Sequence, residues 1–216
     1  MKLGPFEALL FDMDGTILTS IAAVERAWGS WARRVGLGAD TVLDYMHGRR
    51  ALDTIRHFLP DASPEIQAAE AAWLEAFELE DLGGIQAIRG AGAFLSALPA
   101  SRWAVVTSAT RRLALKRIAM AGLPLPEMLV SAEDVARGKP DPSGYRLAAE
   151  RLGVDPARCM VFEDAPAGIA AGLAAGAQVM VVEGNPHPDA PPGHAVIRDY
   201  CSLGVTGTAA LTLTLG

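Results

Sequence analysis

The sequence predicts an α/β fold in which a doubly wound, Rossmann-like parallel sheet carries an inserted, all-helical cap domain. Two observations predict this fold. Short apolar segments alternate with helical segments after residue 87, and a continuous helical block occupies residues 18–86. Alternating strands and helices favour a parallel sheet with helices on both faces. We therefore expect residues 1–17 and 87–216 to form the core domain and residues 18–86 to form the cap domain, called the cap below.

The first core strand is predicted over Ala8–Phe11, which is apolar at every position. An unbroken apolar run is typical of a strand that is covered on both faces, as in a parallel sheet. The strand is expected to end at the acidic sequence that begins with Asp12.

The cap is predicted to be helical because no strand pattern interrupts residues 18–86. Apolar residues recur at helical spacing from Ile21 to Val35, and Gly36 ends that segment. A second helix is expected around residues 52–59. A third begins at Ser63-Pro64, where an N-capping serine precedes a proline at the first helical position, and it continues through Phe77.

The rest of the core is predicted to alternate strands and helices. The expected helices cover about residues 111–121, 142–152 and 166–175, and the expected strands are Trp103–Val106, Met128–Val130, Met160–Phe162, Val179–Val182 and Ala195–Ile197. The last segment, residues 206–216, alternates Thr and Leu. Both an edge strand and a frayed end stay open for it.

The composition limits the partners of the chain. Its 216 residues carry a formal net charge of −6 and no basic cluster, which argues against nucleic acid. Two cysteines are too few for a disulfide framework. Because Pro5 and Glu7 interrupt the first apolar residues and no apolar run is long enough to span a bilayer, we expect a cytoplasmic protein without membrane contact. We expect a monomer or a weak dimer.

Polar residues follow several of the predicted strands. In open parallel sheets, ligands bind outside the carboxyl ends of the strands. The polar residues expected at this edge are Asp12, Asp14, Thr107, Ser108, Lys139, Glu163 and Asp164.

These residues fit a phosphoryl-transfer site. Clustered carboxylates take up protons unless a cation neutralises them, and an oxygen-only ligand set suits Mg²⁺. No His or Cys lies in these loops, which argues against zinc. Lys139 can hold a phosphate as a point charge, and Thr107 and Ser108 can donate hydrogen bonds to phosphate oxygens.

Four ordered motifs resemble those of the haloacid dehalogenase superfamily: Asp12-Met13-Asp14-Gly15-Thr16, Thr107-Ser108, Gly138-Lys139-Pro140 and Glu163-Asp164. The resemblance covers nearly the whole chain. Within the superfamily, the chain resembles the β-phosphoglucomutase-like subgroup, and in it the glycerol-phosphate and 2-deoxyglucose-6-phosphate phosphatases. The resemblance implies a Mg²⁺-dependent phosphatase that acts on a small sugar or polyol phosphate through an aspartyl phosphate.

The resemblance also implies a role for each residue. Asp12 attacks phosphorus, and Asp14 protonates the leaving alkoxide and then activates water. The metal is held by Asp12, the Asp14 backbone carbonyl and Asp164, with Glu163 as a further or water-mediated ligand. Lys139 steadies Asp12 and the phosphoryl oxygens. Phosphate is held by Ser108 and the adjacent Thr107, and which of the two is the principal contact stays open.

The polar turn His47-Gly48-Arg49-Arg50 in the cap has two interpretations. In the first, the turn covers the active site, and Gly48, Arg49 and Arg50 contact the substrate. In the second, it is a solvated basic turn.

The alternative function is that of a sugar phosphomutase of the β-phosphoglucomutase type. The resemblance places a hinge histidine of such mutases where this chain has Val24, and a valine where it has Thr16. Both differences favour hydrolysis. The resemblance implies that phosphonate hydrolases of the superfamily use a cap lysine to form a Schiff base, and residues 18–86 contain no lysine. A carboxylate at Asp14 argues against dehalogenation, which has no alkoxide to protonate. The sequence does not identify the sugar or polyol.

Overall fold

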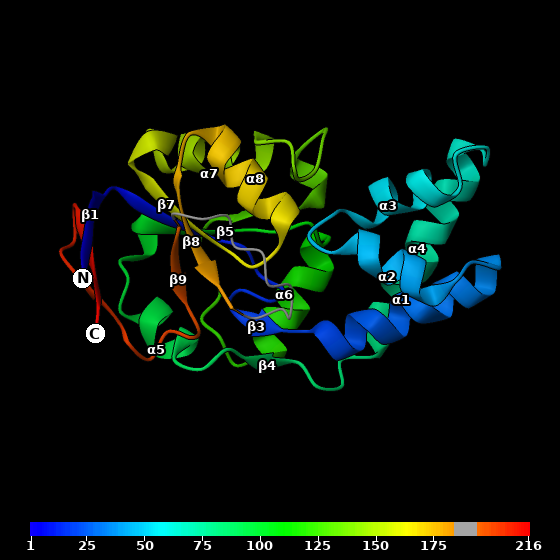
Figure 1. Ribbon diagram of the computed structural model, residues 1–216, viewed down its shortest axis with the longest axis horizontal. Helices are drawn as coiled ribbons and strands as arrows, with labels where there is room; N and C mark the ends of the chain where they lie inside the picture. Colours follow the sequence, from blue (N-terminus) through cyan, green and yellow to red (C-terminus); the bar gives the residue numbers. More distant parts are fainter. Residues whose placement is uncertain (184–193) are drawn as a thin grey trace.

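The computed structural model describes residues 1–183 and 194–216. Its centre is a six-stranded sheet with the order β6-β5-β2-β7-β8-β9, in which all neighbouring strands are parallel (Figure 1). This confirms the predicted fold class, and each predicted core strand is present. The strands are β2 (Ala8–Phe11), β5 (Trp103–Val106), β6 (Leu129–Val130), β7 (Cys159–Glu163), β8 (Gln178–Val182) and β9 (Ala195–Ile197).

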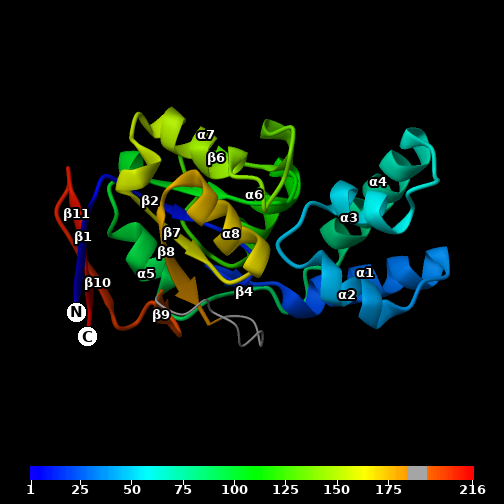
Figure 2. The same ribbon diagram turned by 45° about the horizontal axis from the view of Figure 1, so that its top comes forward.

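Helices cover both faces of this sheet, because alternate side chains of each strand point to opposite faces. Leu9 and Phe11 of β2 pack in one hydrophobic cluster with α5 (Ala91–Ser96) and α6 (Arg111–Met120), whereas Ala8 and Leu10 pack with α7 (Ser143–Leu152) and α8 (Pro166–Ala175). Figure 2 shows α7 and α8 on the side of the sheet opposite α5. In the described part of the chain the core also has three short 3-10 helices: η1 (Ala100–Arg102), η2 (Ala132–Asp134) and η3 (Pro156–Arg158).

The helices between β3 (Leu18–Thr19) and β4 (Gln86–Ala87) lie together beyond the carboxyl ends of the strands (Figures 1 and 2). They are α1 (Ile21–Val35), α2 (Ala39–Met46), α3 (Ala51–Phe58) and α4 (Pro64–Glu80). Their apolar faces share a hydrophobic cluster that includes the fully buried Trp31, Ile55 and Leu74. Within the described residues, no helix has both the length and the apolar character that a membrane crossing requires.

A two-stranded antiparallel ribbon joins the cap to the core. It consists of β3 (Leu18–Thr19) and β4 (Gln86–Ala87). The prediction of an entirely helical segment over residues 18–86 is therefore wrong at both ends. The chain passes from core to cap at β3 and returns at β4. The two segments form strands because their backbone N–H and C=O groups pair with each other, although neither segment carries a strand pattern of its own.

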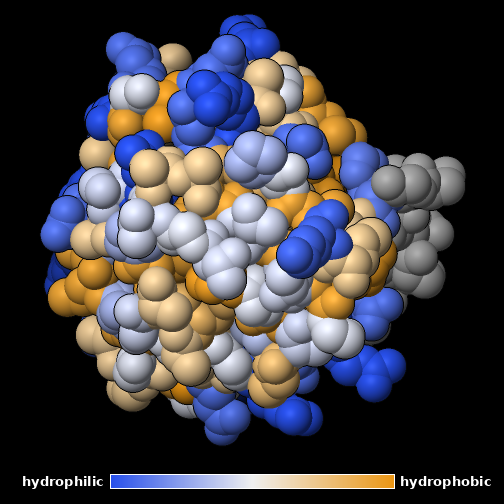
Figure 3. Space-filling view, turned by 90° about the vertical axis from the view of Figure 1, so that its left-hand side faces the viewer, coloured by the Kyte–Doolittle hydropathy of each residue, from blue (hydrophilic) through white to orange (hydrophobic). Residues whose placement is uncertain are grey.

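The C-terminal segment is a strand. β11 (Leu211–Leu215) lies between β1 (Lys2–Phe6) and β10 (Leu203–Thr206) in a second, antiparallel sheet. The alternation places Leu211 and Leu213 in the core with no exposed surface. This decides between the two interpretations left open by the sequence, although the strand is central rather than at an edge. Figure 3, which views this side of the molecule, shows hydrophobic and hydrophilic residues interspersed over it.

Candidate active site

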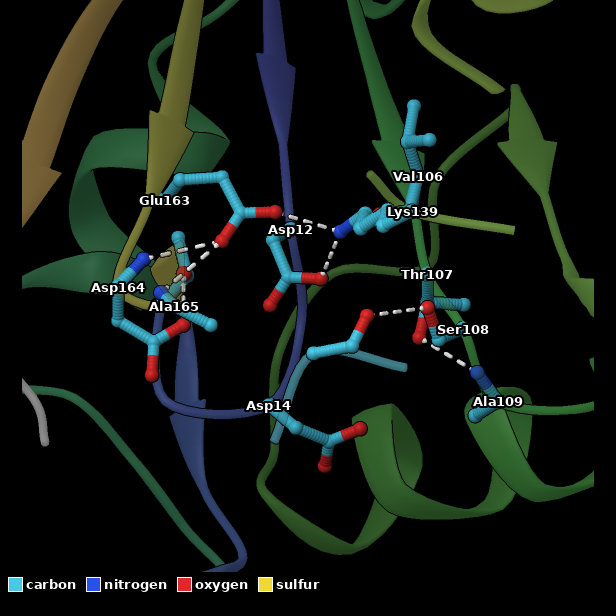
Figure 4. A network of polar contacts seen from close by, with 12 residues as sticks. Asp12, Asp14, Val106, Thr107, Ser108, Ala109, Lys139, Glu163, Asp164 and Ala165 are labelled. Carbon is cyan, nitrogen blue, oxygen red and sulfur yellow. Dashed lines mark hydrogen bonds and ion pairs between the residues drawn. The ribbon is translucent and has the colours of Figure 1, made fainter. Parts of the chain in front are cut away.

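Three neighbouring strands deliver the predicted acidic and hydroxyl residues to one edge of the sheet. Asp12 follows β2, Thr107 follows β5, and Glu163 is the last residue of β7; β2 lies between the other two strands. Lys139 comes from the loop between η2 and α7. Figure 4 shows Asp12, Lys139 and Glu163 converging at this edge. The structure thus brings together residues that are as much as 151 positions apart in the chain, from 12 to 163.

Lys139 is the cation at the centre of this group. Its buried Nζ lies 2.5 Å from Asp12 Oδ1 and 2.6 Å from Glu163 Oε1, and it donates to the Val106 carbonyl oxygen at 3.1 Å. Burial alone would lower the pKa of Lys139, but the carboxylates of Asp12 and Glu163 outweigh burial and raise it. The lysine therefore stays charged.

Asp12, Glu163 and Asp164 form a buried group whose carboxylate oxygens lie within 4.8 Å of one another. Burial raises the pKa of Asp12 well above its ordinary value and that of Asp164 to about 7, although Lys139 opposes both shifts. Such a group binds protons unless a divalent cation takes their place. The donor set, all oxygen and close together, fits Mg²⁺.

Two of the three carboxylates have further partners. Both oxygens of Glu163 are engaged: Oε1 also accepts from the Tyr145 hydroxyl at 2.7 Å, and Oε2 accepts from the backbone N–H groups of Asp164 and Ala165. Thr16 Oγ1 donates to Asp164 Oδ1 at 3.1 Å. These contacts fix the side chains before any ligand arrives.

Two glycines make room for these carboxylates. A Cβ atom built on Gly15 would lie 2.0 Å from Asp164 Oδ2, and one built on Gly168 in the first turn of α8 would lie 1.7 Å from Glu163 Oε1. Gly15 also has a φ of +89°, which disfavours other residues. Any side chain at position 15 would therefore displace Asp164.

Asp14 stands apart from the other carboxylates. Figure 4 shows its side chain directed away from Asp12 and Lys139. Its Oδ1 accepts from Ser20 Oγ at 2.5 Å, and Arg117 Nη1 lies 3.1 Å from both carboxylate oxygens. The side chain keeps 27% of its surface exposed. It is therefore held in place and still reachable from the neighbouring cavity.

Thr107 and Ser108 lie on the side of Asp12 opposite Glu163 (Figure 4). Thr107 Oγ1 accepts from the Ala109 backbone N–H at 3.1 Å, and Ser108 Oγ donates to the Gly48 carbonyl oxygen at 2.8 Å. Neither caps α6, because Thr110 takes that position and accepts from the Leu113 N–H. Their side chains face the same region as Asp12, and their phosphate-binding role stays a prediction.

The predicted cap turn packs against the core, so it is not a solvated turn. Gly48 lies so close to α8 that an added Cβ would be 2.9 Å from that of Ala165. Arg50 Nε bonds to Asp53, and its Nη atoms donate to carbonyl oxygens of residues 135 and 136. The Arg49 guanidinium lies 4.4 Å from the ring centre of Tyr45. Substrate contact by Gly48, Arg49 or Arg50 stays a prediction.

A cavity of about 450 Å³ lies between the cap and the carboxyl ends of the strands. Asp12, Asp14, Asp164 and Ser108 line its core side. The cap contributes residues from α1, the 47–50 turn and α4, among them Val24, Trp28 and Glu75. Pockets of this size hold small organic ligands.

Sequence reasoning missed several residues of the site. Ser20 and Arg117 contact Asp14, and Tyr145 contacts Glu163, but none of the three belongs to a motif. Glu78, also outside the motifs, contacts Arg117. One signal was available for Arg117: it lies one turn after Leu113 on the apolar face of α6, where an arginine needs a buried partner. Tyr145 lies on the buried face of α7, where its hydroxyl group likewise needs a hydrogen-bond partner.

Comparisons with known proteins identify similar sequences. The sequence profile of the haloacid dehalogenase-like hydrolases matches residues 6–176. The chain is 48% identical to hexitol phosphatase A of Escherichia coli over 178 residues, which cover 82% of each chain. It is 39% identical to glycerol-1-phosphate phosphohydrolase 2 of Saccharomyces cerevisiae, over 80% of this chain and 73% of the yeast protein.

A solved structure shares the fold. The β-phosphoglucomutase of Clostridium difficile superposes with a TM-score of 0.79 over 90% of this chain and 91% of its own, at 20% sequence identity. At that identity the likeness concerns the fold and carries no statement about activity.

Proposed function

The chain belongs to the haloacid dehalogenase-like hydrolase family, and we propose that it is a Mg²⁺-dependent phosphatase that hydrolyses a small sugar or polyol phosphate through an aspartyl phosphate. The observation that carries the proposal is the Asp12 carboxylate, held by Lys139 beside Glu163 and Asp164 and lining the cavity. Among the relatives, one is named for hexitol phosphates and another for glycerol 1-phosphate. Their names support a polyol phosphate as the substrate class.

Asp12 and Asp164 are the residues best placed to hold Mg²⁺ directly. Both oxygens of Glu163 already have protein partners, which suits a water-mediated contact. The Asp14 backbone carbonyl completes the proposed ligand set. When bound, the ion supplies positive charge that keeps these carboxylates ionised and offsets charge on the phosphoryl oxygens.

In the first step, an Asp12 carboxylate oxygen forms a bond to phosphorus, and the ester P–O bond breaks. The electron pair of that bond goes to the alcohol oxygen, which takes a proton from the Asp14 carboxyl group. Lys139 and the hydroxyls of Thr107 and Ser108 bind the phosphoryl oxygens. The products are the free alcohol and a phosphorylated Asp12.

In the second step, water attacks phosphorus. Asp14, now a carboxylate, takes a proton from the water, and the bond between phosphorus and the Asp12 oxygen breaks. Inorganic phosphate leaves, and both aspartates return to their initial states. Asp14 thus serves as acid and then as base, which requires its carboxyl group to reach the leaving oxygen from the cavity.

We propose that residues 18–86 act as a separate cap domain that opens for substrate and closes over it. The chain enters the cap at β3 and leaves it at β4, and the cap helices have their own hydrophobic cluster. Closure would exclude water during the first step. The contact between the 47–50 turn and the core supports this proposal, because closure would bring the cap against the cavity.

Hydrolysis is favoured over the phosphomutase alternative. Val24, at the position where the resemblance places a mutase histidine, lines the cavity with an apolar side chain. Thr16 donates to Asp164, a contact that a valine would not make.

The test is a phosphate-release assay with Mg²⁺ on hexitol phosphates, glycerol 1-phosphate, 2-deoxyglucose 6-phosphate and β-glucose 1-phosphate. We expect turnover of at least one polyol or sugar phosphate, its loss in EDTA and its recovery with Mg²⁺. Asp12→Asn should lower kcat by at least about a thousandfold. Isomerisation of β-glucose 1-phosphate without phosphate release, or turnover that survives chelation, would contradict the proposal.

A further inference from the structure

Arg117 is a buried charge that the proposed chemistry does not use. Its side chain is 3% exposed. Nη1 lies 3.1 Å from both oxygens of Asp14, and Nη2 donates to Glu78 Oε1 at 2.9 Å. The guanidinium therefore bridges the predicted acid/base of the core and a glutamate in the last turn of cap helix α4.

Arg117 and Ser20 approach the Asp14 carboxylate together. Ser20 Oγ donates to Oδ1 at 2.5 Å, while Arg117 contacts both oxygens. Ser20 precedes α1 and Arg117 belongs to α6, so two separate elements contribute the two donors. A carboxylate contacted by a guanidinium across both oxygens and by a hydroxyl has little freedom to rotate.

The same contacts argue against a role for Arg117 as a phosphate ligand. The guanidinium is already engaged by Asp14 and Glu78, and Lys139 is the cation beside Asp12. A buried ion pair is weak grounds for expecting added stability, because desolvation of the charges offsets their attraction. What the pair does provide is a fixed position for Asp14.

We propose that Arg117 is a positioning residue for the acid/base step, anchored by Glu78 from the cap. With Ser20 it holds the Asp14 carboxyl group at the wall of the cavity, where the leaving alcohol oxygen would stand. The inference rests on the proposed function, in which Asp14 protonates that oxygen. The position of Asp14 then depends on Arg117 of α6 and on Glu78 of α4.

The test compares two leaving groups. An alkoxide must be protonated as it leaves, whereas nitrophenolate is a stable anion and leaves without a proton. We measure kcat/KM, which reports the steps up to release of the alcohol, for glycerol 1-phosphate and for p-nitrophenyl phosphate with Mg²⁺. For Arg117→Met we expect kcat/KM to fall at least about tenfold for the alkyl ester and less than about threefold for the aryl ester.

Three further variants make the result decisive. Arg112→Met, an exposed arginine on the same helix, should leave both values unchanged. Arg117→Lys keeps the charge and should restore part of the alkyl activity; it also serves if Arg117→Met fails to fold. Asp14→Asn should show the largest drop in the ratio of alkyl to aryl kcat/KM.

Three results would overturn the inference. If Arg117→Met lowers both kcat/KM values in parallel, or lowers neither, while Asp14→Asn lowers the alkyl value selectively, Arg117 does not position the acid. If Asp14→Asn itself leaves the ratio unchanged, the acid/base role of Asp14 fails, and the inference fails with it.

Discussion

At the scale of single residues, the site depends on how closely backbone and carboxylates approach each other. Gly168 lies in the first turn of α8, where a Cβ atom would overlap the carboxylate of Glu163. Replacing a helical glycine with alanine normally stabilises a protein by about 0.5–1 kcal/mol. We predict the opposite for Gly168→Ala, because Glu163 must leave its contacts with Lys139 and Tyr145.

The expected loss for Gly168→Ala is about 1–3 kcal/mol in free energy of unfolding, with an apparent Mg²⁺ affinity at least about tenfold weaker. Chemical denaturation and a Mg²⁺ titration of activity measure these two quantities. Gly29→Ala in α1 is the matched control, since its nearest neighbour would lie 3.7 Å from the new Cβ. If both variants behave alike, the packing of Gly168 against Glu163 does not matter.

The pKa of Asp164 predicts a pH dependence of stability in the metal-free protein. Burial raises this pKa from the ordinary 3.8 to about 7 in the folded state. The folded state therefore holds this proton more tightly than the unfolded chain does, and the resulting stabilisation is complete below about pH 4 and lost as the pH rises through 7.

Thermal unfolding in EDTA measures this effect. The pH range is about 5 to 8, which brackets the raised pKa. We expect Tm to fall with rising pH, and to fall less when Mg²⁺ replaces the proton. Asp164→Asn should remove much of the slope. A Tm that rises with pH in EDTA for the wild-type protein would contradict the assignment.

Several of the residues that the sequence could predict are attached to strand ends. Asp12, Thr107 and Glu163 follow or end apolar strands, and parallel topology then places them together. Arg117, Glu78 and Tyr145 could not be located in this way, because their roles depend on which helix faces pack together.

At the scale of elements, the small antiparallel sheet closes one end of the core. β11 is its central strand, and Leu213 is fully buried while its neighbour Thr212 is only half-buried. We predict that Leu213→Ala lowers the free energy of unfolding by about 2–5 kcal/mol, because the cavity left behind lies in the main hydrophobic cluster.

Thr212→Ala, one position along the same strand, should change stability by less than about 0.5 kcal/mol. Urea denaturation measures both variants. Equal effects would show that the alternation of β11 does not determine its packing.

Elements differ in how far the sequence determines them. β2 and β5 were predicted to the residue, since four consecutive apolar residues bounded by polar ones leave little freedom. β3 and β4 have two residues each and carry no pattern. β1 contains a glycine, a proline and a lysine, and it is a strand because β11 pairs with it.

At the scale of the whole molecule, contacts between cap and core converge on the proposed site. Ser108 donates to Gly48, Arg50 bonds to the loop that leads to Lys139, and Arg117 joins Asp14 to Glu78. Each contact links a cap residue to a core residue next to the proposed chemistry. Sequence patterns predicted a helical segment and an α/β core. They did not predict which residues of the two touch, because this depends on how the segments pack together.

The most direct test of the proposed function is to trap the phosphorylated enzyme. The protein is mixed with a turned-over polyol phosphate and Mg²⁺, quenched in acid within one turnover, and digested for mass spectrometry. We expect a phosphoryl group on Asp12 in the wild-type protein and none in Asp12→Asn. Rapid turnover with no phosphorylated peptide, or with the phosphoryl group on another residue, would contradict the claim that Asp12 is the nucleophile.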